Sequence, residues 1–291
     1  MRDRWRDGYI AVDWGTTNRR AYLVDSSGVL VRKIEDDRGV SKLTPEAFPA
    51  EMKQLRQQLG PLPLLLAGMV GSNKGWRQMP YVPCPAGAPE LVAAVYWAQE
   101  NAILVPGVSC REGASFDVMR GEEVQLVGAA AAGLLPARAL VCHPGTHTKW
   151  VRCGEGRIES FKTLMTGELF ALLRQHSILA DRLGDQVEPG ADFDAGVRNG
   201  LEGDPLDGLF DIRARFLLNG PARNDAAHLS GLLIGNDIRH GLHQELTVAV
   251  MGRPELTELY ARALALGGCA AMRIDGTEAF LAGARLLVKR L

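Results

Sequence analysis

The chain lacks the features that mark several protein classes. Its cysteines are odd in number and form no C-x-x-C pair: Cys84, Cys110, Cys142, Cys153 and Cys269. This pattern argues against a disulfide framework or a zinc site and favours reduced thiols in a cytoplasmic protein. No stretch reaches the roughly 18 uncharged apolar residues of a membrane helix. Residues 1–8 are charged, so we expect no signal peptide and no membrane partner.

The chain also lacks a large net charge of either sign. The 33 basic and 34 acidic residues leave a formal charge of −1, so no overall basic field attracts nucleic acid. An anionic ligand must therefore be held by local groups. The 291 residues, of which 46% are hydrophobic, suffice for one large or two medium domains with a real core.

Strands and helices alternate along the chain. Apolar runs bounded by turn residues predict strands at 9–13, 21–24 and 29–34, and again at 139–142, 149–153 and 157–163. The spacing of apolar residues predicts helices at 45–60, 91–99 and 122–135. Between them, residues 68–87 form a loop rich in glycine, proline and aromatics, and a loop of that length usually carries function.

The two halves of the chain share one pattern. Gly15-Thr16 and Gly145-Thr146 lie 130 residues apart, and each pair follows an apolar strand and precedes a predicted hairpin. A single strand–glycine turn is common in α/β proteins and carries little weight. Two such turns at matching positions indicate a duplicated α/β unit, and we place the domain boundary after residue 137.

Both Gly-Thr turns have the chemistry to bind phosphate. A glycine turn exposes successive N–H groups to phosphate oxygens, and the threonine hydroxyl adds a donor. Asp13, at the end of the first strand, can orient Mg²⁺ directly or through water; His143 stands at that place in the second half. The residues that we expect at the ATP phosphates are Gly15, Thr16, Thr17, Asn18, Gly145, Thr146, His147 and Thr148.

These loops resemble those of the actin/hexokinase-like ATPases: Asp13-Trp-Gly-Thr-Thr-Asn18 is similar to the first phosphate loop and Pro144-Gly-Thr-His-Thr148 to the second. Over nearly its whole length the chain more closely resembles the 2-dehydro-3-deoxygalactonokinase family. Further segments carry this resemblance: Ala67-Gly-Met-Val-Gly-Ser72, Pro80-Tyr-Val-Pro-Cys-Pro-Ala-Gly87, Asp117-Val-Met-Arg-Gly-Glu-Glu123, Met165-Thr-Gly-Glu-Leu-Phe170 and Ser230-Gly-Leu-Leu-Ile-Gly235.

The resemblance implies an α/β fold of two ribonuclease-H-like (actin/hexokinase-like) domains around an ATP cleft. Residues 1–137 would bind the sugar acid and carry the first phosphate loop and the catalytic base. Residues 138–291 would carry the second phosphate loop and bind adenosine. The implied activity is ATP- and Mg²⁺-dependent phosphorylation of the 6-hydroxyl of 2-dehydro-3-deoxy-D-galactonate in galactonate catabolism.

Other functions stay open. A kinase of another sugar or aldonic acid is the nearest alternative, and a nucleotide-binding regulator without transfer chemistry is a second. The chain departs from the family pattern at Asn73-Lys74 (Arg-Gln in the family), His143 (Leu) and Thr148 (Ser). Lys74 adds a cation near the expected sugar site, so the stereochemistry of the substrate stays open, as does a homodimer.

A carboxylate cluster precedes the second phosphate loop. Phosphoryl transfer needs a carboxylate that accepts the proton of the attacking hydroxyl. In related carbohydrate kinases, Gly-Asp-Gln at a helix start carries this base, and Gly121-Glu122-Glu123 is similar. We predict Glu122 as the general base, with Asp117 or Glu123 as alternatives. Acidic residues in a first helical turn also complement the helix dipole, which would account for one of the two glutamates.

The sugar acid is expected in the first half and the adenosine in the second. Gly252 lies between a strand and a helix, so nearby N–H groups can face ribose or phosphate; the alternative is a plain turn with Pro254 at the first helical position. A substrate carboxylate needs cations and N–H donors, and aromatic rings suit sugar faces. The predicted substrate contacts are Arg20, Gly71, Ser72, Lys74, Trp76, Arg77, Tyr81 and Arg120.

Overall fold

The computed structural model describes residues 2–98, 101–184, 186–220, 223–242 and 247–291. The chain divides into two compact units: unit 1 comprises residues 1–138, 153–160 and 276–291, and unit 2 comprises residues 139–152 and 161–275. The first division falls one residue from the predicted boundary. Residues 276–291 belong to unit 1, whereas the sequence predicts them in the second half.

Helix packing explains this return of the chain. Helix α9 (Gly276–Arg290) lies along α3 (Glu122–Ala131). The two helices approach through glycines: a Cβ at Gly128 would lie 2.0 Å from the Ala279 carbonyl oxygen, and one at Gly283 would lie 1.9 Å from that of Val124. Because no side chain fits between these backbones, the contact is specific to glycine.

A six-stranded sheet forms the centre of unit 1, in the order β3-β2-β1-β4-β7-β6. Its strands are β1 (Gly8–Trp14), β2 (Arg19–Asp25), β3 (Leu30–Asp36), β4 (Leu64–Gly68), β6 (Tyr96–Ala98) and β7 (Ala102–Leu104). β1 pairs antiparallel with β2 and parallel with β4, in a register that sets Trp14 opposite Gly68. The carboxyl ends of β1 and β4 therefore meet at one edge of the sheet.

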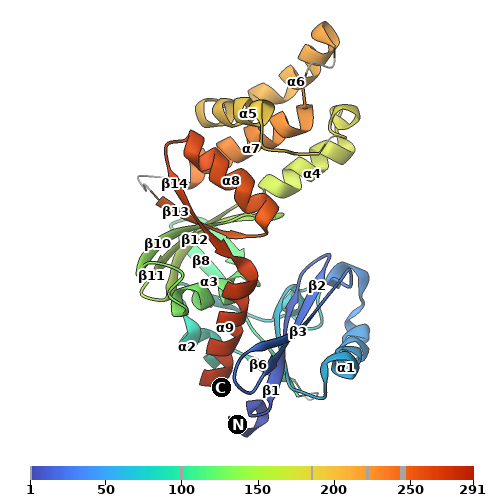
Figure 1. Ribbon diagram of the computed structural model, residues 1–291, viewed down its shortest axis with the longest axis vertical. Helices are drawn as coiled ribbons and strands as arrows, with labels where there is room; N and C mark the ends of the chain where they lie inside the picture. The colour runs from blue at the N-terminus through green and yellow to red at the C-terminus, as the bar shows by residue number, and fades with distance from the viewer. Residues whose placement is uncertain (1, 99–100, 185, 221–222, 243–246) are drawn as a thin grey trace. The chain divides into compact units, whose positions relative to one another are not determined.

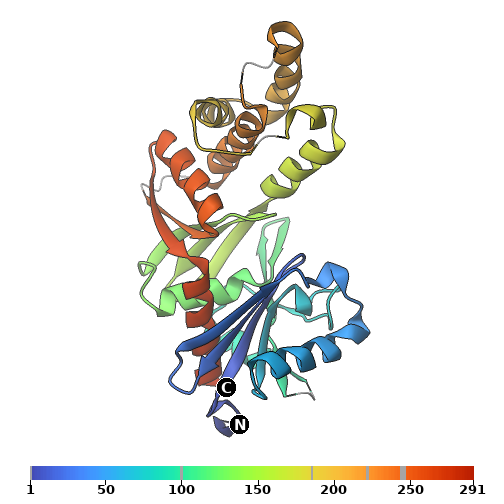
Figure 2. The ribbon, with the colours of Figure 1, turned by 45° about the vertical axis from the view of Figure 1, so that its right-hand side comes forward.

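Helices cover both faces of this sheet, which is why β1 is apolar on both sides. Trp14 packs on Phe48 of α1 (Phe48–Leu59), with ring centroids 5.0 Å apart. On the other face, the ring of Tyr22 lies 5.6 Å from that of Phe280 in α9. Figures 1 and 2 show α1 and α9 on opposite sides of β1–β3.

A small three-stranded sheet leads the chain into α3. It consists of β5 (Tyr81–Pro83), β8 (Gly107–Glu112) and β9 (Ser115–Met119). The expected helix at 91–99 is wrong in part: α2 (Ala88–Ala93) ends early, and β6 pairs with β7 at the sheet edge instead; residue 99 lies outside the described residues. The expected helix at 122–135 ends at Ala131, two residues before Gly133, whose φ of 71° favours glycine.

Unit 2 repeats the topology of unit 1. Its sheet has the order β12-β11-β10-β13-β14, which matches β3-β2-β1-β4-β7 strand for strand. The strands are β10 (Arg138–His143), β11 (Thr148–Gly154), β12 (Arg157–Leu164), β13 (Thr247–Gly252) and β14 (Ala270–Asp275). β1 and β10 begin 130 residues apart. The predicted repeat of strand, Gly-Thr turn and hairpin is therefore confirmed.

The α-helices described in this unit are α4 (Thr166–His176), α5 (Ala191–Glu202), α6 (Pro205–Asn219), α7 (Asp225–Gly241) and α8 (Pro254–Leu266). α5 and α7 lie so close together that only glycine fits at two positions of α7. A Cβ at Gly231 would lie 2.1 Å from the Phe193 carbonyl oxygen, and one at Gly235 would lie 2.3 Å from that of Val197. The glycines of the Ser230–Gly235 segment thus serve packing. Among the helices described, none combines the length and the apolar character needed to cross a membrane.

Candidate active site

A neighbouring backbone segment fixes the turn between β1 and β2. The carbonyl groups of residues 15–17 accept hydrogen bonds of 3.0 Å from the N–H groups of residues 39–41. Gly39 permits this contact, since a Cβ there would lie 2.3 Å from the Thr16 carbonyl oxygen. Thr16 and Thr17 are exposed, and their N–H groups have no hydrogen-bond partner within the described ranges. The turn is therefore held through its carbonyl groups, and these two donors are not used by the described residues.

Asp13 lies beside this turn at the end of β1. Its cross-strand neighbour Arg20 places Nη1 3.5 Å from Asp13 Oδ2 and donates through Nε to Glu35 at 2.9 Å. Lys33 and Arg20 lower the pKa of Glu35 to about 2. Arg20, a predicted substrate contact, is thus held between two carboxylates of its own sheet. The Asp13 side chain keeps 21% of its surface exposed and can reach a ligand.

Two glycines bring the start of α3 to the same edge of the sheet. A Cβ at Gly68 would lie 2.7 Å from the Trp14 carbonyl oxygen, and one at Gly121 would lie 3.2 Å from Gly68 Cα. Gly68 has a φ of 94° and Gly121 a φ of 108°. Both positions therefore favour glycine for two reasons, the close contact and the positive φ. The end of β1, the end of β4 and the first residue of α3, Glu122, therefore lie together.

The two glutamates at the start of α3 differ in environment. Glu122 is half-buried, and its carboxylate accepts a 3.2 Å hydrogen bond from the Arg120 N–H group. Glu123 is fully buried; Oε2 accepts from the Gly121 N–H group at 2.6 Å, and Oε1 has no partner among the described atoms. Burial and the nearby Glu122 raise the pKa of Glu123 to about 8. Asp117 lies on β9 and accepts from the Val118 N–H group.

The predicted substrate residues do not all gather at one place. Arg120 packs over the Tyr81 ring at 4.5 Å and beside Gly71, whose added Cβ would lie 2.8 Å from Arg120 Nη1. Arg77 instead stacks on Tyr96 at 4.0 Å and donates to its hydroxyl at 3.1 Å. Ser72 is buried, Lys74 is exposed, and Trp76 packs against the core of unit 1.

The second Gly-Thr turn is held in a similar way, in unit 2. The Thr146 carbonyl accepts from the Glu168 N–H group at 2.8 Å, and a Cβ at Gly167 would lie 2.3 Å from the Gly145 carbonyl oxygen. His147 Nε2 lies 2.5 Å from Glu168 Oε2. Thr146 and His147 are exposed. In each turn a glycine from another segment therefore lies against the loop carbonyls.

Thr148 faces inward and joins a buried network that the sequence analysis did not predict. Its hydroxyl lies 2.8 Å from that of Tyr260, which donates to Asp237 Oδ2 at 2.6 Å. Trp150 Nε1 and the Thr166 hydroxyl also donate to Asp237. Burial raises the pKa of Asp237. A carboxylate within the apolar helix α7 was the one available clue.

Gly252 ends β13 beside the second turn. Its added Cβ would lie 3.5 Å from the Pro144 carbonyl oxygen, which places it next to the segment that carries Gly145. Pro254 begins α8, as the plain strand-to-helix turn predicts. This geometry is compatible with both interpretations of Gly252.

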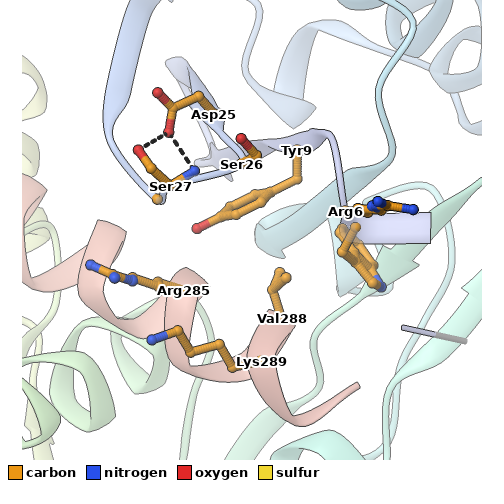
Figure 3. A pocket seen from close by; sticks show the side chains of 10 residues that line it. Arg6, Tyr9, Asp25, Ser26, Ser27, Arg285, Val288 and Lys289 are labelled. Carbon is orange, nitrogen blue, oxygen red and sulfur yellow. Dashed lines mark hydrogen bonds between the residues drawn. The ribbon is translucent and has the colours of Figure 1, made fainter. Parts of the chain in front are cut away.

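A separate hollow of about 350 Å³ lies in unit 1, between the start of β1, the β2–β3 turn and the end of α9. Figure 3 shows the Tyr9 hydroxyl pointing into it, between the Asp25–Ser27 turn and Arg285. Burial raises the pKa of Tyr9 to about 12. Tyr9 lies four residues from Asp13, or about 13 Å along β1. This hollow contains none of the predicted site residues.

Known proteins resemble this chain over most of its length. It is 37% identical over 287 residues to 2-dehydro-3-deoxygalactonokinase of Escherichia coli (strain K12). The aligned region covers 95% of this chain and 96% of that protein. It is 36% identical over 290 residues to a proposed 2-dehydro-3-deoxygalactonokinase of Rhizobium meliloti (strain 1021), with 94% of each chain covered.

Solved structures share its fold. The crystal structure of a proposed 2-dehydro-3-deoxygalactonokinase from Sinorhizobium meliloti has a TM-score of 0.90 and 34% identity, and the match covers 97% of this chain and 98% of that one. A second solved structure, component A of (R)-2-hydroxyglutaryl-CoA dehydratase from Acidaminococcus fermentans, shares the fold alone. Its TM-score is 0.52 and its identity 13%, and the match covers 97% of this chain and 98% of that one. The predicted actin/hexokinase-like fold class is confirmed. The model of the 2-keto-3-deoxy-galactonokinase family matches residues 13–287, and the chain belongs to this family.

Proposed function

We propose that this chain is a kinase that transfers the γ-phosphoryl group of ATP to the terminal hydroxyl of 2-dehydro-3-deoxygalactonate. The observation that carries the proposal is the meeting of three features at one edge of the unit 1 sheet: Asp13, the first Gly-Thr turn with its exposed threonines, and Glu122. Full-length relatives that bear the name of this activity support it.

Asp13 would hold Mg²⁺, which neutralises charge on the phosphates when it is bound. Mg²⁺ keeps several waters and is usually bound through one or two carboxylates plus substrate phosphates. A single partly exposed carboxylate fits that requirement, and within the described ranges no group of three or more metal-ligating side chains offers a fuller cage. Arg20 would then help to orient Asp13 rather than contact the sugar.

Glu122 would act as the general base. It is half-buried at the start of α3, and its carboxylate is held by one backbone N–H group, so an oxygen remains available to a substrate hydroxyl. Glu123 is a weaker alternative, because the raised pKa of its fully buried carboxyl keeps it protonated at neutral pH. Asp117 is a second alternative.

Both Gly-Thr turns would contact ATP. The first would use the N–H groups of Thr16 and Thr17, and the second those around Gly145 and Thr146, which are exposed in unit 2. Thr148, whose hydroxyl is engaged with Tyr260, would support the second turn from within. Gly252 would lie near the phosphates or the ribose. The cysteines, all of them free thiols, accord with a cytoplasmic enzyme.

A substrate panel tests the proposal. The chain is incubated with Mg²⁺ and ATP and with 2-dehydro-3-deoxygalactonate, its C4 epimer, several aldonic acids and neutral hexoses. We expect ADP release to be fastest with 2-dehydro-3-deoxygalactonate, and nuclear magnetic resonance to place the new phosphate on the terminal oxygen. Faster ADP release with another acid would make the chain a kinase of that sugar acid. If no member of the panel caused ADP release, the proposed kinase function would be contradicted.

A further inference from the structure

We propose that Arg120 binds the carboxylate of the sugar-acid substrate, in a site formed by Arg120, Gly71, Met79 and Tyr81. This inference rests on the proposed kinase function and adds to it the group that distinguishes an acid from a neutral sugar. The site lies entirely within unit 1, where residues 71–81 approach the segment that joins β9 to α3.

Arg120 is a buried cation with unused donors. The residue is only 8% exposed. Nη2 donates to the Met79 carbonyl at 2.9 Å, while Nε and Nη1 are buried with no partner among the described atoms. A buried guanidinium without an opposite charge is costly, and such groups are normally paired or bound to an anion. An anionic ligand would supply what the protein does not.

The nearby acids do not neutralise this cation. Glu122 accepts from the backbone N–H group of Arg120, and no bond to the guanidinium is seen in the described structure. Glu123 lies close enough for the positive charge of Arg120 to act on its pKa, yet burial raises that pKa to about 8 and leaves the carboxyl neutral at pH 7. Neither carboxylate therefore neutralises the positive charge of Arg120 in the described structure.

The surroundings hold the guanidinium in place. The Tyr81 ring lies 4.5 Å from Cζ, a distance at which an aromatic face attracts a cation. Gly71 is necessary for this position, because an added Cβ would lie 2.8 Å from Nη1. A planar guanidinium that is fixed in this way is suited to a carboxylate, which it can bind through two parallel hydrogen bonds.

The position of Arg120 favours the substrate carboxylate over ATP. The backbone N–H group of Arg120 donates a 3.2 Å hydrogen bond to Glu122, so the residue that carries the cation is adjacent to the residue that we propose as the base. One small sugar acid carries both the carboxylate and the terminal hydroxyl, so its two ends could reach these neighbouring side chains. If Arg120 instead contacted the transferred phosphoryl group, it would act equally on every substrate.

The test compares the sugar acid with its carboxamide, in which the charge is lost and the size is kept. For the wild type we expect kcat/KM to be at least about 100-fold higher for the acid. Arg120→Met should lower kcat/KM for the acid by at least about 100-fold, mainly through KM, and change that for the amide less than about threefold. Arg120→Lys should recover part of the loss, because it keeps the charge without the planar fork.

Two further variants guard against a folding defect. Gly71→Ala should displace the guanidinium and raise KM for the acid while Arg120 itself is retained. Arg111→Met is the matched control, because Arg111 is an exposed arginine on β8 that stacks on Phe116 of β9 at 5.0 Å. This variant should leave the kinetics of both the acid and the amide unchanged. Thermal melting of all variants identifies any that fail to fold, and Gly71→Ala then carries the test.

Other outcomes overturn the inference in distinguishable ways. An equal loss of kcat for acid and amide in Arg120→Met would place Arg120 at the phosphoryl group. Unchanged kinetics in a folded Arg120→Met would make it structural. A wild type that phosphorylates no sugar acid would contradict the proposed function and, with it, this assignment.

Discussion

The hydroxyl of Tyr260 donates a 2.6 Å hydrogen bond to the buried carboxylate of Asp237 and lies 2.8 Å from the hydroxyl of Thr148. One carboxylate on α7 is thereby connected to the residue that follows the second Gly-Thr turn. A buried polar network of this kind stabilises a structure when every member is satisfied, and it is costly when one member is removed. The network therefore couples the stability of unit 2 to the shape of the turn.

Tyr260→Phe tests this coupling. The change removes one donor to Asp237 and the hydroxyl that lies 2.8 Å from that of Thr148, so we expect a loss of about 1–3 kcal/mol in the free energy of unfolding. KM for ATP should also rise. Urea denaturation and steady-state kinetics measure the two effects. Tyr96→Phe, which removes a hydroxyl that accepts a hydrogen bond from exposed Arg77, is the control and should cost far less.

Asp13→Asn tests the proposed Mg²⁺ ligand. The substitution keeps the size of the side chain and removes its charge. Turnover should fall by at least about 100-fold, which corresponds to roughly 3 kcal/mol of transition-state stabilisation, and the Mg²⁺ concentration for half-maximal rate should rise. Asp211→Asn, at an exposed carboxylate of α6, should have no effect on either value. Near-normal turnover in the Asp13 variant would remove this residue from the mechanism.

Glu122→Gln tests the base. Glutamine keeps the shape and the hydrogen bond from Arg120 but cannot accept a proton. Removal of a general base typically costs about 10²- to 10⁴-fold, and the loss should appear in kcat with little change in either KM. Glu123→Gln should be much milder, since the raised pKa keeps the Glu123 carboxyl neutral. A severe Glu123 or Asp117→Asn variant beside a mild Glu122 variant would reassign the base.

The stability of the protein should depend on pH through Glu123. Its pKa is about 8 in the folded protein and near 4.5 when unfolded, so the unfolded chain releases this proton first as pH rises. Glu123 therefore lowers stability progressively between about pH 4.5 and 8, by up to about 1.4 kcal/mol per pH unit. Glu123→Gln lacks this loss, and its advantage in unfolding free energy over the wild type should grow from pH 5 to pH 8. A constant difference would show that Glu123 does not titrate in this way.

The glycines behind the two turns offer a last prediction. A Cβ at Gly39 or Gly167 would lie 2.3 Å from a loop carbonyl oxygen, so Gly39→Ala and Gly167→Ala should displace the turns and raise KM for ATP severalfold. Gly190→Ala is the control, because nothing lies within 4 Å of its added Cβ and its φ of −174° suits any residue. Unchanged ATP kinetics in both loop variants would argue against phosphate binding by these turns.

Local patterns in the sequence were sufficient to predict the repeated strand–turn–hairpin unit and most of the neighbouring elements. β1, its turn and the following hairpin are specified by a short apolar run, a glycine and a second alternating run, and the same signals recur near residue 140. Asp13 could be predicted as a site residue from the sequence because its place near a strand end is itself a local property. The helix at 91–99 failed for the opposite reason: pairing of β6 with β7 outweighed the helical spacing of a short segment.

Only the tertiary structure decided which side chains are buried and what they meet. The sequence presents Arg20, Arg77 and Arg120 as equivalent cations, yet the fold places the first between two carboxylates, the second on Tyr96, and the third in a buried position with unused donors. Burial likewise separates Glu122 from Glu123. These properties arise from contacts between segments far apart in the chain, because desolvation and charge depend on the whole surroundings of a group. The amino-acid sequence by itself determined the repeated scaffold and its two turns; the packing of the scaffold decided the chemistry of the side chains beside them.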